Sequence, residues 1–547
     1  MCAEKITISD IKSAEKLLGI TYSKSEREQM VQNLEGQILS AKLRRGIELD
    51  NTTPMASKFD PRLPGFQMPS RSDIKLQKRD IKLPKNKEDI AFASIGEQGK
   101  WIKDGLLTSR KLTEIYLERI ESFESKLECF ATVTKDQALA EADAMDLLTS
   151  AKINLGPLHG IPYGLKDLFD TKGVRTGWGA EPYQNRVPVE DAEIVKRLRA
   201  AGAVILGKTT LGALAYNDIW YGGRTKNPWN LNEGSSGSSA GSASATAAAL
   251  CSFAIGTETL GSITSPSLRC GTTGLRPTFG RVSRQGGMAL CWSLDKIGPI
   301  CRSVEDTGIV LSTLNGYDEN DLSSIRAPFN FDTSKNIKDL VIGYLPEAFE
   351  DGATEVDRAA LKVAMSLGAK VKEVKLEDLP YMSLINILYA EAAAAFEHLT
   401  LSDEDDTLTW QDDGAWPNTF RKARFLSAVD HVQLDRLRYL VMKALDNLFS
   451  EIDILIGPFD TGPMLVASNF TGHPCLHLRA GFQKLASRGA ASLGEGKLST
   501  GEAGKGIKFL VPHGISLWGR LFEEEKILNF GIALEKELGV YKKRPDL

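Results

Sequence analysis

The chain has 547 residues, of which 42% are hydrophobic and 25% are charged, and its formal net charge is −4. This composition is typical of a globular protein and gives no reason to expect nucleic acid or an anionic membrane as a partner. No apolar run approaches the roughly 20 residues needed to cross a bilayer, and the N-terminus lacks the apolar core of a secretory signal. Seven cysteines without a CxxC pair indicate reduced thiols and a cytoplasmic location.

The first part of the chain predicts helices and then an extended connector. Ile11, Ala14, Leu17 and Leu18 share one helical face, with charged residues opposite. From about residue 50 this pattern gives way to the Pro- and Lys-rich tract FDPRLPGFQMPSRSDIKLQKRDIKLPKNK. We therefore expect residues 1–87 to form an N-terminal helical extension with its connector, and residues 88–547 to form the main domain.

The rest of the chain alternates between helix and strand patterns. Helices are predicted at about 90–148, 191–201, after 306, within 376–449 and at 523–538. Strands are predicted just before Lys166 and at 203–206, 251–256, 340–346 and 452–458. This alternation favours an α/β fold with helices covering a sheet. The Gly-, Ser- and Lys-rich run at 486–508 predicts a surface loop.

The chemistry is concentrated in the Gly-, Ser- and Ala-rich stretch from residue 227 to 299. A serine attacks a carbonyl only if a base takes its proton and hydrogen-bond donors hold the oxyanion. The turn Thr259-Leu260-Gly261-Ser262 fits the donor role, because glycine lets a backbone approach a ligand closely. None of the six histidines lies near these serines in sequence, so we expect a lysine with a lowered pKa as the base. Lys166, in HGIPYGLKDLFD, follows an apolar stretch and a glycine.

Several separated blocks of this chain resemble the amidase signature family in family order, over about residues 87–540. The blocks are GIPYGLKD, GAVILGKTTLGALAY, NPWN, the stretch from EGSSGSSAGSAS to SLDKIGP, NFTGHP and HGISLWGRLFEE. The resemblance implies an α/β fold with a large mixed β-sheet covered by helices on both faces, and residues 88–547 as the catalytic domain. It also implies a hydrolase that cleaves carbon–nitrogen bonds through an acyl-enzyme, without metal or organic cofactor. Homodimers are common among proteins of this kind.

The resemblance also implies a role for each matching residue. Ser262 matches the nucleophile, Lys166 the base, and Ser238 the bridging serine that the family holds on a cis peptide bond. Ser239 and Glu258 match supporting positions, and we expect the carboxylate of Glu258 to brace the loop by hydrogen bonds. The oxyanion hole would be formed by the backbone N–H groups of Thr259, Leu260, Gly261 and Ser262.

The signature departs from the family pattern at three places. Leu260 stands where the family has glycine, and a leucine does not readily adopt positive φ, so the turn must use a conformation open to other residues. Thr264 stands where the family has arginine, which removes a partner expected for Glu258. Ser236 and Gly237 replace the first glycine pair.

Other motifs have weaker interpretations. Residues 202–209 match the phosphate-loop pattern GxxxxGK[ST], but Ala-Val-Ile-Leu in its middle is typical of a strand. Residues 237–241 match the GxSxG nucleophile elbow around Ser239, which needs a preceding strand that NPWNLNEGSS does not predict. The SxxK match at Ser13 has no KTG partner. His473 and His477 lie four apart with Cys475 between them, but Pro474 argues against a helical zinc site.

The substrate is indicated only coarsely by the sequence. The apolar and aromatic stretches at 380–399 and 412–440 predict a pocket for hydrophobic or aromatic amides, anilides or carbamates. Two alternatives to a standalone amidase stay open: an amidotransferase A-type subunit with glutaminase activity, and a catalytically degenerate binding protein. The side chains proposed to line the pocket are Tyr381, Met382, Ile385, Tyr389, Trp416 and Phe420.

Overall fold

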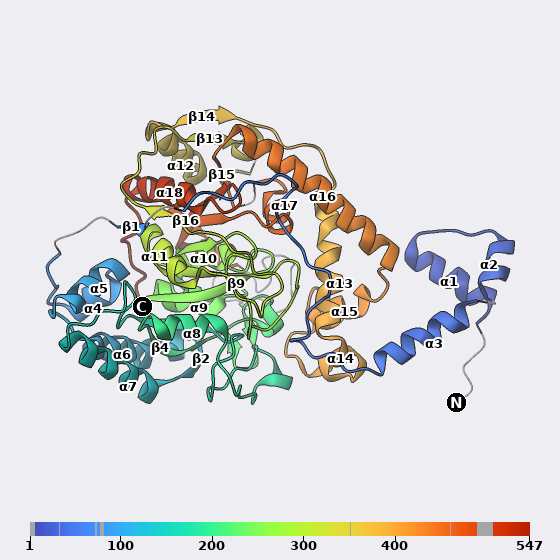
Figure 1. The fold of residues 1–547 in the computed structure, drawn as a ribbon, viewed down its shortest axis with the longest axis horizontal. Helices are drawn as coiled ribbons and strands as arrows, with labels where there is room; N and C mark the ends of the chain where they lie inside the picture. The colour runs from blue at the N-terminus through green and yellow to red at the C-terminus, as the bar shows by residue number, and fades with distance from the viewer. Residues whose placement is uncertain are drawn as a thin grey trace.

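A mixed sheet of eleven strands forms the centre of the molecule in the computed structural model (Figure 1). The structure describes residues 6–31, 33–71, 74–76, 81–350, 352–459, 461–488 and 507–547. In order across the sheet, the strands are β14 (Lys370–Glu373), β13 (Val341–Tyr344), β15 (Ile454–Pro458), β17 (Phe509–Gly519), β16 (Cys475–Leu485), β10 (Thr273–Arg276), β11 (Lys296–Cys301), β9 (Phe253–Glu258), β3 (Pro162–Lys166), β4 (Val204–Thr209) and β2 (Phe130–Val133).

The sheet has a parallel group toward each edge and an antiparallel centre. Strands β9, β3 and β4 run parallel to one another, as do β15, β13 and β14. The strands between them pair antiparallel. All residues of β3, β4 and β9 are buried, which explains why these strands are continuous apolar or small-residue runs in the sequence. The predicted mixed sheet is thus confirmed.

Helices cover both faces of this sheet. On one face, α9 (Ala240–Ala247) and α10 (Thr264–Cys270) pack in a cluster with Ile300 of β11. On the other face, α18 (Glu524–Leu538) lies against Leu476 of β16 and Leu517 of β17, and it packs beside α11 (Val304–Leu314). The remaining helices are α4 (Lys87–Phe92), α5 (Ile95–Lys103), α6 (Ser109–Leu127), α7 (Lys135–Ser150), α8 (Glu193–Ala200), α12 (Glu355–Ser366), α13 (Ile385–Ala395), α14 (Glu397–Leu401), α15 (Trp416–Ala423), α16 (Ala428–Glu451) and α17 (Met464–Phe470).

The N-terminal helices α1 (Ile8–Leu18), α2 (Lys24–Val31) and α3 (Leu34–Arg45) lie at one side of the molecule in Figure 1. Ile11 is buried between them, whereas Leu17 and Leu18 on the predicted apolar face are exposed. The end of α3 is held to the main body by a bidentate ion pair from Arg44 to Glu397, with both N–O distances 2.7 Å. After α3, residues 46–71 contain no helix or strand, and Asn51 among them is bonded to Ala289 of the main body. That residues 1–87 are a separate unit stays a proposal.

One predicted element differs in detail from the observed structure. The helical region 90–148 is interrupted by β2, whose pairing with β4 is a long-range contact that local periodicity does not report. Glu128, with φ of 51°, ends α6 just before this strand. The run 202–209 is indeed a strand, because six of its residues form the buried β4 rather than an open phosphate loop. Most of the predicted loop at 486–508 lies outside the described residues, and no helix within the described ranges could cross a bilayer.

Candidate active site

Lys166, at the end of β3, lies at the centre of a cluster of hydroxyl groups. Its Nζ atom is 2.8 Å from the Ser238 hydroxyl, 3.1 Å from that of Ser239 and 2.8 Å from that of Thr257. The apolar strand β3 buries the lysine completely, and β9 beside it supplies Thr257. The structure therefore brings together the predicted base and the predicted bridging serine.

The surroundings of Lys166 favour the neutral amine. Burial holds the pKa of Lys166 well below its usual value, and the more distant carboxylates Asp295 and Glu258 oppose this only in part. A neutral amine has two N–H donors and one lone pair. Ser239 donates its own hydrogen to the carbonyl of Thr257, so its oxygen is available to accept from the lysine. The Thr257 hydroxyl can accept the second N–H, which leaves the lone pair for Ser238.

Ser238 and Ser239 lie where the chain enters α9. The peptide bond between Gly237 and Ser238 is cis. No Cβ would fit at Gly237, because it would lie 1.8 Å from the carbonyl oxygen of Asn217. Ser239 is anchored on both sides, since its hydroxyl accepts from the Thr257 N–H at 3.1 Å and its N–H donates to the Ser262 carbonyl at 3.1 Å.

The turn that carries Ser262 presents unused backbone donors. Gly261 adopts the left-handed conformation with φ of 86°, whereas Leu260 keeps a negative φ, so leucine is accommodated because the next residue makes the turn. Among the described residues, the N–H groups of Thr259, Leu260, Gly261 and Ser262 have no hydrogen-bond acceptor. In the same part of the chain, no hydrogen bond joins the Ser238 and Ser262 hydroxyls; their segments are joined through the Ser239 backbone.

Glu258 braces this turn as expected, but its cationic partner comes from another place in the sequence. Its carboxylate accepts from the N–H groups of Ile263 and Thr264 at 2.9 and 3.0 Å, and Arg276 of β10 forms an ion pair with it at 2.7 Å. Burial by itself would raise the pKa of Glu258, but Arg276 and the N–H donors outweigh it and lower the pKa to about 2. Thr264 thus removes one expected partner of Glu258, and the fold brings another cation, Arg276, to the same carboxylate.

Ser262 is 8% exposed and faces a cavity of about 230 Å³. One part of its wall is apolar and another is cationic. The lining residues are Tyr216, Asn217, Ser236, Gly237, Leu260, Gly261, Ser262, Ser265, Leu268, Arg269, Phe459, Leu465 and Arg488.

None of the six side chains proposed for the substrate pocket lines this cavity in the described part of the chain. Trp416 and Phe420 are buried and stacked on each other with ring centroids 5.0 Å apart, so they form part of the core. Trp416 also packs behind the cavity-lining Tyr216 at 4.9 Å. Tyr381 is buried and donates to the carbonyl of Glu377, whereas Met382 is exposed. On α13, Ile385 is half-buried and Tyr389 is exposed.

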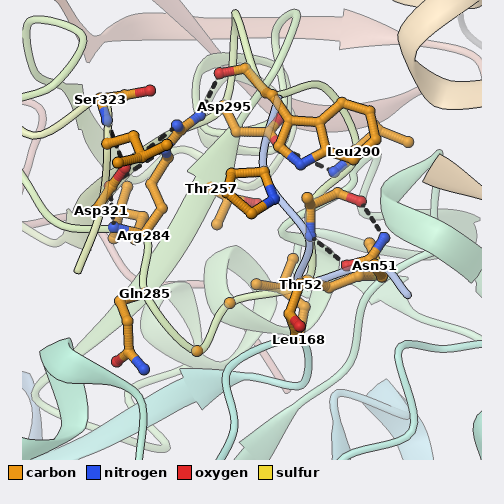
Figure 2. A pocket seen from close by; sticks show the side chains of 18 of the residues that line it. Asn51, Thr52, Leu168, Thr257, Arg284, Gln285, Leu290, Asp295, Asp321 and Ser323 are labelled. Atoms are coloured by element: carbon orange, nitrogen blue, oxygen red, sulfur yellow. Dashed lines mark hydrogen bonds and ion pairs between the residues drawn. The ribbon is translucent and has the colours of Figure 1, made fainter. Parts of the chain in front are cut away.

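A second cavity, of about 430 Å³, is lined by Thr257, the neighbour of Lys166, and not by Ser262 (Figure 2). Thr257 and Asp295 line its inner wall, and the N-terminal connector, from Asn51 to Phe59, lines its outer wall. Asn51 fixes the connector there: its side chain donates to the carbonyl of Ala289 and accepts from the N–H of the same residue, both at 2.8 Å. Neither the contact of Thr257 with Lys166 nor this position of the connector was predicted; periodicity in the sequence carries no signal for either.

The competing motifs have structural explanations. A short strand, β8 (Asn230–Gly234), does precede the GxSxG segment. Among the described residues it pairs with β7 (Lys226–Asn227) alone, outside the main sheet, and Ser239 is fully buried. His473 and His477 are buried and bonded to the hydroxyls of Thr471 and Ser516. Within the described ranges, no group of three His, Cys, Asp or Glu side chains is arranged to hold a metal ion.

Comparison with known proteins identifies the class of the fold and the site. The family model described as Amidase matches residues 111–528, which is more than half of the chain. The chain therefore belongs to the amidase family, whose members hydrolyse carbon–nitrogen bonds, and the predicted membership in the amidase signature family is confirmed.

Particular relatives differ in what they do. The A-type subunit of the glutamyl-tRNA(Gln) amidotransferase of Geobacter sp. (strain M21) is 32% identical, with 84% of this chain and 100% of the relative covered. The solved structure of the native peptide amidase from Stenotrophomonas maltophilia is 26% identical, with 83% of this chain and 98% of that chain covered and a TM-score of 0.68. A bacterial aryl acylamidase of the amidase signature family, at 20% identity over 83% of this chain and 99% of that chain, has a TM-score of 0.68 and supports the fold alone.

Proposed function

We propose that this protein is a serine amidohydrolase that cleaves amide bonds through an acyl-enzyme on Ser262. The observation that carries the proposal is the buried Lys166, whose Nζ contacts three hydroxyls and whose pKa is lowered by burial. A lysine with two acceptors for its N–H groups has its lone pair left for Ser238 and can act as a general base.

The proposed reaction uses the residues as a relay. Neutral Lys166 takes the proton of Ser238 while Ser238 takes that of Ser262, and the Ser262 oxygen attacks the substrate carbonyl. The oxyanion that forms accepts hydrogen bonds from the unused N–H groups of the turn at 259–262, which are fixed in place before the reaction. Protons then return along the relay to the leaving amine as the carbon–nitrogen bond breaks. Water attacks the acyl-enzyme by the same route and releases the acid and Ser262.

The cavity at Ser262 supports a substrate with an apolar acyl part. Leu260, Leu268, Leu465 and Phe459 supply apolar wall next to the nucleophile, and Tyr216 adds an aromatic ring. We therefore still expect hydrophobic or aromatic substrates. The residues proposed to contact them are now these cavity-lining side chains, and no longer the six side chains on and around α13 and α15 that the sequence suggested.

A second candidate function is the glutaminase step of an amidotransferase A-type subunit. The Geobacter relative favours it, since that protein matches along its full length. One assay distinguishes the two candidate functions. Glutaminase activity that appears only with partner proteins would favour the amidotransferase. Hydrolysis of aryl amides by the isolated chain would favour the amidohydrolase.

Labelling with a fluorophosphonate tests the common chemistry. We expect one adduct, located on Ser262 by peptide mass spectrometry, and its loss in Ser262→Ala and Lys166→Ala variants that keep the native circular dichroism spectrum. An adduct on Ser239 would instead indicate a nucleophile-elbow mechanism. The absence of any adduct on the folded wild-type protein would favour a binding protein without catalysis.

A further inference from the structure

Two carboxylates lie near the cavity at Ser262, and each is already paired with its own arginine. Asp218 forms an ion pair with Arg224 at 3.1 Å. Glu233 forms one with Arg488 at 2.6 Å and also accepts from the Arg488 N–H at 2.9 Å. Each carboxylate is therefore already neutralised by one arginine, and neither is available to pair with a third cation.

Arg269 is that further cation. It lies on α10, seven residues after the nucleophile, is only 5% exposed, and lines the same cavity as Ser262. Among the residues that the structure describes, it forms no ion pair, and its one hydrogen bond, to the carbonyl of Gly234, is 3.5 Å long. Burial, and then repulsion from Arg488, lowers the pKa of Arg269 to about 10, so the guanidinium stays charged at neutral pH.

A buried charge without a paired counter-ion is unfavourable, and an anionic ligand group would relieve it. A guanidinium presents its N–H donors in a planar fork that matches a carboxylate. A carboxylate carries one negative charge, whereas a phosphate monoester carries about 1.5 to 2, so one unmatched guanidinium is better suited to the carboxylate.

We propose that the cavity at Ser262 selects amides whose acyl part ends in a carboxylate, held by Arg269 with Arg488 beside it. The apolar wall formed by Leu260, Leu268 and Leu465 would contact the methylene chain between this carboxylate and the scissile amide. The proposal deepens the proposed function, on which it rests, by naming the substrate class: half-amides of dicarboxylic acids.

The test compares two anilides that differ only at the far end of the acyl chain, glutaryl 4-nitroanilide with a carboxylate and valeryl 4-nitroanilide with a methyl group. We expect the wild-type enzyme to prefer the glutaryl substrate by roughly 10- to 100-fold in kcat/KM, the range for one charge-assisted contact. Arg269→Met should bring this ratio close to one, and Arg269→Lys should retain part of it. Arg436→Met, which removes an exposed arginine from α16, is the matched control and should leave the ratio unchanged.

A binding measurement separates this proposal from the proposed catalytic function. Calorimetry on Ser262→Ala should show binding of glutaranilic acid but not of valeranilide, and Arg269→Met in the same background should abolish it. Arginine-dependent binding without turnover by the wild type would support the anion site and count against the amidohydrolase. The proposal is overturned if Ser262 is labelled by a fluorophosphonate and the glutaryl preference is absent, or if Arg269→Met leaves the ratio of the two substrates unchanged.

Discussion

At the scale of single residues, the base decides how the site responds to pH. Folding lowers the pKa of Lys166, so the neutral amine that accepts a proton becomes more abundant as pH rises. We expect kcat/KM for an aryl amide to rise with pH to a plateau, with a midpoint below the usual lysine pKa of 10.5. Lys166→Ala should lower the plateau by about 10²- to 10⁴-fold. A profile that falls steadily from about pH 6 to 9, with the protein still folded, would contradict a lysine base.

Thr257 is expected to position Lys166 rather than to contact substrate. Its hydroxyl lies 2.8 Å from Nζ, and an acceptor at this place favours the protonated lysine as well as fixing the amine. Thr257→Val should therefore lower kcat by roughly 5- to 10-fold and move the acid limb of the pH profile to lower pH. Thr257→Ser keeps the hydroxyl and should therefore retain the wild-type kcat and the wild-type pH profile. A valine variant with an unshifted pH profile would show that Thr257 serves packing only.

At the scale of elements, a buried ion pair ties the end of β9 to β10. Glu258 and Arg276 are both fully buried, and Arg276 also donates to the Ser468 hydroxyl and the His473 carbonyl. Glu258→Gln leaves the guanidinium without its counter-ion, so we expect the free energy of unfolding to fall by about 3–5 kcal/mol. In urea titrations, the double variant with Arg276→Met should lose less stability than the sum of the two single variants. Additive losses would mean that the two residues act independently.

The connector between α3 and α4 is another element whose role can be tested. The side chain of Asn51 bonds both backbone groups of Ala289: its nitrogen donates to the carbonyl, and its oxygen accepts from the N–H. Asn51→Ala should expose this segment, so that trypsin cleaves after Lys58 faster than in the wild type, while Asn51→Asp, which keeps the acceptor, should give an intermediate rate. Equal cleavage rates in all three proteins would show that other contacts hold the connector.

At the scale of the whole molecule, buried titratable groups make the stability of the fold depend on pH. Burial, and then repulsion from Arg276, lowers the pKa of His473 from 6.5 to about 3, and burial lowers that of His477 to about 3 as well. The unfolded chain therefore binds more protons at these two histidines between these values, and their contribution to stability is lost as pH decreases from about 6.5 to 3. Glu258 adds to this loss between pH 4.5 and 2. Buried carboxylates act in the opposite direction, because burial raises the pKa of Glu535 to about 8 and the pKa values of Asp167 and Asp306 to about 6.

The contribution of one histidine is measured as the difference in the free energy of unfolding in urea between wild type and His477→Asn across that pH range. The loss of stability caused by the variant should become smaller as pH decreases from about 6.5 to 3, because the asparagine does not titrate whereas the buried histidine is penalised in acid. A difference between the two proteins that stays constant across this range would contradict a buried, neutral His477.

The sequence alone determined the alternation of strands and helices and the candidate residues for the chemistry. Apolar runs are local, so they predict strands such as β3 and β15 within a few residues, and signature blocks identify Lys166, Ser238 and Ser262 as candidates wherever the fold places them. Only the tertiary structure decided the order of the eleven strands, the existence of β2 and the partners that meet across the site. Arg276 reaches Glu258, and Arg269 and Arg488 reach one cavity, because strands and helices distant in sequence pack together. Such contacts depend on pairing and burial, which no local pattern of residues encodes.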